Sequence, residues 1–355
     1  MSLPELWFLL IAVLWAGYFL LEGFDFGVGA LLPFLPRNEQ DRRAMFDSVG
    51  PVWDGNEVWL VVAGGATFAA FPAWYATTFS GFYLALLLVL VLLIVRAVSF
   101  EWRGKGESSR WRSGWMWANT VGSVGAAFVW GVALANFVHG VPLDSSNDYA
   151  GNFWDLFSAY TVFAGLATVL LFTFHGATYL TLRTSGDLCE RAARAARRLA
   201  LPAALAAGGL LAWTVAVGID RNEKDVFPPL LPAAIGVAVL LPAVVFAFTR
   251  RSGWAFAMTA LGTVAVVATF FTSLYPRVLV SHPDFANSLT ISNAASEHYT
   301  LKVITVVAVF LIPVVLLYQA WTYHVFRARI GGEQPAANPV EALAPKPNDA
   351  DAPTS

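Results

Sequence analysis

Apolar runs long enough to cross a bilayer as helices recur along almost the whole of this 355-residue chain. A spanning helix needs about 20 such residues, and every backbone polar group in the bilayer must find its partner within the protein, so only helices and closed barrels can span. Barrel strands need only about 9–11 residues and alternate in polarity. The runs here do not alternate, and the sequence therefore predicts an all-α polytopic membrane protein.

Composition narrows the class further. The chain is 57% hydrophobic and 13% charged, whereas a soluble globular domain carries roughly twice that charge. A formal net charge of −2 argues against nucleic-acid binding. Cys189 is the single cysteine, which excludes an internal disulfide, a CxxCH haem attachment and a thiolate metal cluster. The N-terminus lacks a basic segment and a small-residue cleavage site, so we expect a retained first span.

Hydropathy and helix-breaking residues divide the chain into about nine expected membrane helices. Their approximate ranges are 6–33, 52–72, 78–100, 115–138, 157–183, 199–218, 228–249, 253–275 and 300–326. We expect residues 1–330 to form one integral membrane domain. The Pro-, Ala- and Asp-rich segment 331–355 is expected to be a disordered cytoplasmic tail.

Loop charges give the orientation. The loops after odd-numbered spans contain most of the basic residues, namely Arg37, Arg42, Arg43, Arg103, Lys105, Arg110, Arg112, Arg191, Arg194, Arg197, Arg198, Arg250 and Arg251. The loops after even-numbered spans contain only Arg221, Lys224, Arg277 and Lys302. Because basic loops remain in the cytoplasm, this bias predicts an N-terminus outside and a C-terminus in the cytoplasm.

Two of the expected spans carry acids within apolar sequence. Glu22 and Asp25 lie in the first span, and Asp54 and Glu57 lie in the second. An ionised carboxylate inside a spanning helix costs about 2.5–3.5 kcal/mol, so packing alone is a poor explanation for four of them. Each pair has a spacing of three, which places it on one helix face, and the orientation places all four in the cytoplasmic half. We interpret them as candidate proton-transfer residues, with Asp25 and Asp54 first.

Three further polar residues fall at a similar depth and are candidate supporting residues. Arg96 is expected to neutralise one of the acids or to snorkel towards the interface. Asn56 lies between the two acids of the second span, and His175 is a proton relay, a haem ligand or a buried hydrogen-bonded histidine. The competing interpretation of the whole set is a structural network in which the acids bond Asn56, Arg96 and indole N–H groups.

Glycines in the same two spans predict close helix contacts. Gly23 and Gly27 form a small-xxx-small step, which allows a neighbouring helix to approach closely. Gly64 and Gly65 are expected to do the same on the second span.

The sequence does not supply an obvious haem site. A b-type haem in a helical bundle needs His or Met ligands that face each other inside the membrane. The remaining histidines fall at span ends or in loops, and these are His139, His282, His298 and His324. Met116 and Met258 lie towards cytoplasmic span ends. We therefore predict no catalytic, cofactor-binding or metal-binding residue in this chain, and we expect any redox centres to lie on another chain.

These motifs resemble those of subunit II of the cytochrome bd-type quinol oxidases. The matching segments are GFDFGVG at Gly23–Gly29, GPVWDGNEVWLVVAGGATFAAFP at Gly50–Pro72, SGFYLALLLVLVLLIVRAVSFEWR at Ser80–Arg103, FHGATYLTLRTSGDL at Phe174–Leu188, LYPRVLVS at Leu274–Ser281 and LTISNAASEHYTLKV at Leu289–Val303. They occur in order and cover most of residues 17–328. The Gly-Phe-Asp and Trp-Asp-Gly-Asn blocks are highly specific.

The resemblance implies a haem-free subunit of a bacterial cytoplasmic-membrane oxidase that oxidises quinol and reduces dioxygen to water. Its partner would be a subunit I that holds b-type and d-type haems, and its fold would be two four-helix bundles plus one peripheral helix. The family's acids fall on Asp25 and Asp54, at the entry of protons from the cytoplasm. The resemblance leaves open a structural quinone, a small single-span subunit, and whether menaquinol or ubiquinol is the donor.

Two other functions fit the same residues. A proton-coupled transporter would also use intramembrane acids and glycine-interrupted helices, although no second broken helix occurs at a corresponding position in the other half. A purely structural scaffold subunit would keep the acids fixed in hydrogen bonds.

Overall fold

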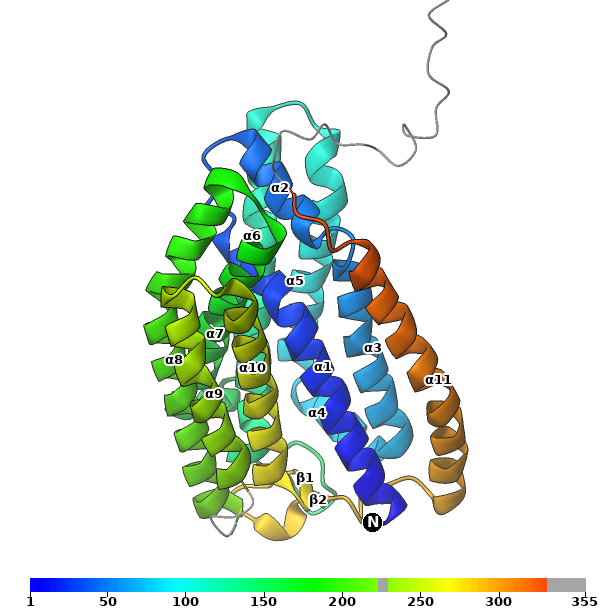
Figure 1. The fold of residues 1–355 in the computed structure, drawn as a ribbon. Helices are drawn as coiled ribbons and strands as arrows, with labels where there is room; N and C mark the ends of the chain where they lie inside the picture. Colours follow the sequence, from blue (N-terminus) through cyan, green and yellow to red (C-terminus); the bar gives the residue numbers. More distant parts are fainter. Residues whose placement is uncertain (223–228, 331–355) are drawn as a thin grey trace, which may run out of the picture.

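The computed structural model describes residues 1–222 and 229–330. The expected disordered tail, 331–355, lies outside the described residues. Within them the chain is almost entirely helical (Figure 1). The helices are α1 (Leu3–Leu31), α2 (Glu39–Val49), α3 (Trp53–Ala70), α4 (Pro72–Gly81), α5 (Tyr83–Trp102), α6 (Ser109–His139), α7 (Ala159–Arg183), α8 (Gly186–Asn222), α9 (Leu230–Phe248), α10 (Ser252–Leu274) and α11 (His298–Val325).

Each expected span overlaps one of these helices. Among the described residues, eight helices are long and apolar enough to cross a membrane, namely α1 and α5 to α11. The second expected span corresponds to α3, an 18-residue helix that contacts both α1 and α11 (Figure 1). The all-α membrane fold is confirmed. The division into two four-helix bundles stays a prediction, because α1 packs against α3 and α6 and also against α7 and α10.

Two short helices were not expected. α2 lies at the end of the molecule that we expect to face the cytoplasm, at the top of Figure 1. α4 begins at Pro72, which ends α3 because proline lacks an N–H group and is favoured in the first turn of a new helix. The third span therefore begins at Tyr83 rather than near residue 78.

α8 is much longer than its apolar sequence suggested. Its 37 residues extend from Gly186, and at 1.5 Å per residue they span about 55 Å, against a hydrocarbon core of about 30 Å. Arg191, Arg194, Arg197 and Arg198 therefore lie on a helical extension, whereas the sequence assigned them to a loop.

The opposite end of the molecule is closed by irregular segments and a small sheet. β1 (Arg277–Leu279) pairs antiparallel with β2 (Leu289–Thr290). The same segment reaches the α6–α7 connection, where the Val141 N–H donates to the Val280 carbonyl at 3.0 Å. These contacts hold the α6–α7 connection and the segment after α10 against the helix ends.

The glycine predictions were half right. A Cβ atom on Gly27 would come 1.9 Å from the Phe172 carbonyl oxygen and 2.8 Å from the Gly176 nitrogen, so α1 and α7 cross in backbone contact. A Cβ atom on Gly23 would come 2.8 Å from the ring of Phe172, so this glycine leaves room for a side chain of α7. The expectation for Gly64 and Gly65 was wrong within this chain, because no atom from elsewhere in residues 1–222 or 229–330 lies within 4 Å of a Cβ atom at either position.

Candidate functional site

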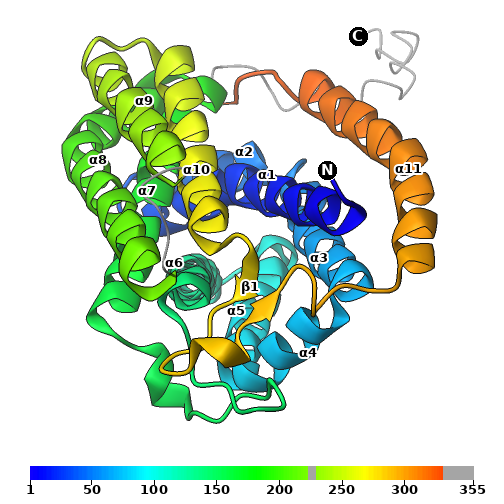
Figure 2. The same cartoon turned by 90° about the horizontal axis from the view of Figure 1, so that it is seen from below.

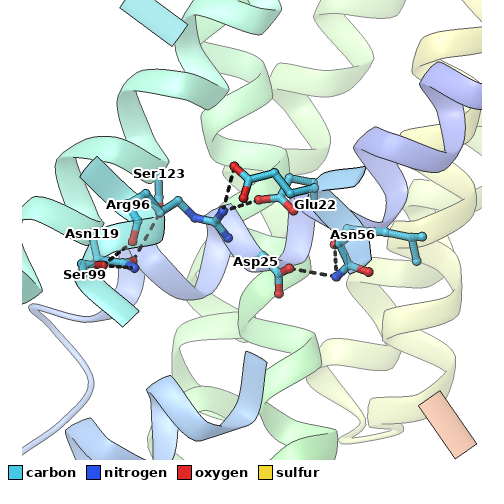
Figure 3. Close-up of polar contacts among 9 residues, drawn as sticks. Glu22, Asp25, Asn56, Arg96, Ser99, Asn119 and Ser123 are labelled. Atoms are coloured by element: carbon cyan, nitrogen blue, oxygen red, sulfur yellow. Dashed lines mark hydrogen bonds and ion pairs between the residues drawn. The ribbon is translucent and has the colours of Figure 1, made fainter. Parts of the chain in front are cut away.

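A fully buried ion pair joins α1 to α5. Arg96 Nη1 lies 2.5 Å from Glu22 Oε1, and neither side chain is exposed (Figure 3). The guanidinium also lies over the Phe26 and Phe100 rings, with its central carbon 5.0 and 5.4 Å from their centroids. Burial of a lone cation in a membrane helix is costly, and the carboxylate and the two ring faces compensate part of that cost. The structure therefore confirms that Arg96 pairs with an acid.

Asp25 lies one turn along α1 and binds a different partner. The Asn56 amide donates from Nδ2 to Asp25 Oδ2 at 2.8 Å (Figure 3), which links α1 to α3. Both side chains are buried. The spacing of three in the sequence thus places Glu22 and Asp25 close together while each acid faces another helix.

The acids of α3 stand at the edge of this cluster. Glu57 Oε1 lies 4.0 Å from Arg96 Nη1, and its side chain is 19% exposed. Asp54 lies in the first turn of α3 and is exposed, and its side chain forms no ion pair or hydrogen bond with any residue that the structure describes. The four carboxyl groups therefore differ in exposure. Asp54 is exposed, Glu57 is partly enclosed, and Glu22 and Asp25 on α1 are fully buried.

α11 contributes two residues that the sequence did not indicate. Tyr323 donates from its hydroxyl to Asn56 Oδ1 at 2.7 Å, and the Gln319 amide donates to the same oxygen at 3.1 Å. Because these donors occupy the carbonyl oxygen of Asn56, its NH₂ group is directed at Asp25. An i, i+4 pair of polar residues in an apolar helix was the available signal.

A second polar row continues from Arg96 between α5 and α6. Asn119 Nδ2 donates to Ser99 Oγ at 2.8 Å, and the Ser123 hydroxyl approaches Asn119 Oδ1 at 3.4 Å (Figure 3). All three side chains are buried. α6 can approach closely here because Gly122 faces Arg96 and the Leu92 carbonyl. Sequence reasoning missed this row.

His175 lies apart from the acids. Its Nδ1 contacts Thr259 Oγ1 at 2.7 Å, its Nε2 contacts the Leu20 carbonyl at 3.2 Å, and its ring stacks on Phe256. Both nitrogens are therefore occupied in this fully buried ring. Of the three alternatives, the buried hydrogen-bonded histidine describes this geometry.

The charge balance of the cluster determines what it can do. One guanidinium faces three carboxyl groups, those of Glu22, Asp25 and Glu57, and no second basic side chain forms an ion pair with them among the described residues. Full ionisation would leave a net charge of −2 in a largely dry site, which is costly. The site is therefore suited to carry exchangeable protons. Residues 1–222 and 229–330 contain no cluster of three or more His, Cys, Asp or Glu side chains that could hold a metal ion.

Comparison with known proteins places this geometry in a family context. The family model described as cytochrome bd terminal oxidase subunit II matches residues 3–326. The chain is 41% identical to the cytochrome bd ubiquinol oxidase subunit 2 of Bacillus subtilis, over 94% of this chain and 98% of that protein. It is 38% identical to the cytochrome bd-I ubiquinol oxidase subunit 2 of Escherichia coli K12, over 92% and 95%.

A solved structure shares the fold. The bd oxidase from Geobacillus thermodenitrificans contains a chain that matches with a TM-score of 0.72, covering 92% of this chain and 99% of that one, at 19% sequence identity. At that sequence identity the likeness shows the fold alone.

Proposed function

The chain belongs to the cytochrome bd terminal oxidase subunit II family, and from that premise we propose that it forms one wall of a proton inlet from the cytoplasm in a quinol oxidase complex. Its relatives from Bacillus subtilis and Escherichia coli are subunits 2 of cytochrome bd ubiquinol oxidases. Membership of this family leaves the proton-coupled transporter without support. In the proposed complex, quinol oxidation and dioxygen reduction take place on a partner subunit that holds the b- and d-type haems.

The observation that carries the proposal is the succession from an exposed to a buried carboxyl group. Asp54 is exposed at the start of α3, Glu57 is 19% exposed one turn further, and Glu22 is fully buried against Arg96. Asp25 extends the same cluster through Asn56. Protons would enter at Asp54 and reach the buried carboxyl groups by hops between acids or through water.

The position of Asp54 also supports a partner on this face. An exposed acid is unfavourable against lipid hydrocarbon, and another protein chain or a water-filled interface would remove that cost. α11, which flanks α3, exposes most of its apolar side chains, and Leu301 is its one buried residue. We place the haem-bearing subunit against α3 and α11, where Asp54 would open into the shared interface.

Histidine placement supports redox centres on the partner. His175 is enclosed by the membrane helices, and both its nitrogens are already hydrogen bonded, so it would have to give up these contacts to bind haem iron.

Replacement of single acids separates a proton inlet from a structural scaffold. In the purified oxidase complex, Asp54→Asn and Asp25→Asn should each lower quinol-dependent oxygen consumption by at least about tenfold, because a group that transfers protons is removed while its size is kept. Haem content per complex should be unchanged. Asp47→Asn, at an exposed residue of α2 outside the acid cluster, is the matched control. Full turnover in both variants would favour the scaffold.

A further inference from the structure

A cavity of about 630 Å³ lies between the end of α1 and helices α6, α7 and α8. It is separate from the acid cluster, and α8 lies on the opposite side of the molecule from α11 in both views of the fold (Figures 1 and 2). Its volume is in the range of sites that hold small organic ligands.

The rim of the cavity is strongly basic. It is lined by the four arginines Arg37, Arg191, Arg194 and Arg198. The three on α8 have spacings of three, four and seven, so they share one face of the helix. Arg37 approaches from the segment that follows α1. A single phosphate group could therefore be met from two sides.

Only one of these arginines is committed to another contact. Arg191 is buried, donates from Nε to the Leu35 carbonyl at 2.7 Å and pairs through Nη2 with Asp41 at 2.5 Å. Its role is to hold the turn after α1 against α8. The side chains of Arg37, Arg194 and Arg198 form no ion pair or hydrogen bond within the described part of the chain, so three positive charges at the rim have no acidic partner.

The remainder of the cavity is apolar. Its lining continues through Ala30 and Leu31 of α1, Val124 of α6, and Val169 and Thr173 of α7. Val169 lies 14 residues before the end of α7 at Arg183, which corresponds to about 21 Å along the helix. The cavity thus runs from a basic rim near the cytoplasmic interface into the hydrocarbon region.

We propose that this cavity binds an anionic phospholipid of the cytoplasmic leaflet, with the phosphate held by Arg37, Arg194 and Arg198 and an acyl chain along the apolar wall. Basic pockets between membrane helices on the cytoplasmic side suit such headgroups. Free phosphate would satisfy the arginines but not the apolar wall. Arginines that only fix the topology of the chain need neither a shared cavity nor a common helix face.

Native mass spectrometry of the complex purified from its own membrane tests this site. After delipidation, palmitoyl-oleoyl phosphatidylglycerol should bind saturably, and the paired substitution Arg194→Gln and Arg198→Gln should weaken its binding by about tenfold or more. The paired substitution of both residues to Lys should restore most of the affinity, because lysine also binds phosphate as a point charge. Oxygen consumption of the Gln variant reports whether the complex is still assembled.

The control removes the same charge elsewhere on the same membrane face. Arg110 and Arg197 do not line the cavity, so Arg110→Gln with Arg197→Gln should leave phosphatidylglycerol binding unchanged. Equal weakening by both pairs would mean general attraction to a basic surface and would overturn the proposal. Equal binding of palmitoyl-oleoyl phosphatidylcholine, or displacement of the lipid by millimolar inorganic phosphate, would overturn it too.

Discussion

The pairing of Glu22 with Arg96 is the strongest charge interaction of the membrane-embedded cluster. Both side chains are fully buried, and Arg96 Nη1 lies 2.5 Å from Glu22 Oε1. Breaking a buried pair is more costly than replacing it whole, because the remaining charge keeps its desolvation cost without the attraction. The two residues should therefore behave as one unit in stability measurements.

Substitution of this pair gives a test by a double-mutant cycle. Arg96→Met should destabilise the protein by about 3–5 kcal/mol, because Glu22 is left buried without its cation. Adding Glu22→Gln should recover much of that loss. The measurement is the thermal unfolding midpoint of the purified complex in detergent. Additive losses in the double variant would show that the contact does not stabilise the fold.

At the scale of helices, two side chains of α11 hydrogen bond to Asn56 of α3, and these bonds also orient the Asn56 amide. Tyr323 and Gln319 both donate to Asn56 Oδ1, and Asn56 donates to Asp25. The rest of α11 is largely exposed. A peripheral helix thus sets the direction of the amide that binds a candidate proton-transfer residue.

Tyr323→Phe should remove one of the two hydrogen bonds that orient the Asn56 amide and so weaken its hold on Asp25, while the complex stays assembled. The lost hydrogen bond contributes about 1 kcal/mol, so assembly should persist. The pH profile of oxygen consumption should move, because Gln319 alone then orients the Asn56 amide that donates to Asp25. Tyr318→Phe is the control, since Tyr318 is 61% exposed on the same helix. An identical pH profile in Tyr323→Phe and Tyr318→Phe would exclude this positioning role.

The residues of the site that could be predicted from the sequence are the charged residues that interrupt its apolar spans. Glu22, Asp25 and Arg96 stood out because charge is rare in apolar spans, and the loop charges predict that they lie in the cytoplasmic half. The rotation of each helix about its axis could not be predicted, because it depends on packing against neighbouring helices. Only the structure therefore shows that Asp25 is buried and Asp54 is exposed. Ser99, Asn119 and Gln319 were missed because uncharged polar residues are too common in membrane helices to be distinctive.

The ends of the helices were also poorly predicted from the sequence. The last residues of α4, 78–81, were assigned to the following span, although α4 is less apolar than α5. The extension of α8 was read as a loop because its arginines interrupt the hydropathy, although alanine between them is the best helix former. That extension carries two of the arginines of the proposed lipid site.

At the scale of the whole molecule, the acid cluster and the basic cavity lie on different sides of one helix, α1. Glu22 and Asp25 face α5 and α3, whereas Ala30 and Leu31 line the cavity beside α8. The proposed proton entry and the proposed lipid site can therefore be altered separately. Each proposal has a set of substitutions that leaves the other untouched.

Proton uptake during a single turnover tests the central claim most directly. The fully reduced complex with Asp54→Asn is mixed with dioxygen, and a pH-sensitive dye follows proton uptake while haem absorbance follows electron transfer. If Asp54 is the entrance, uptake should slow by at least about tenfold, and the first haem oxidation step that needs no proton should keep its rate. Proton uptake as fast as in the unmodified complex would contradict the account.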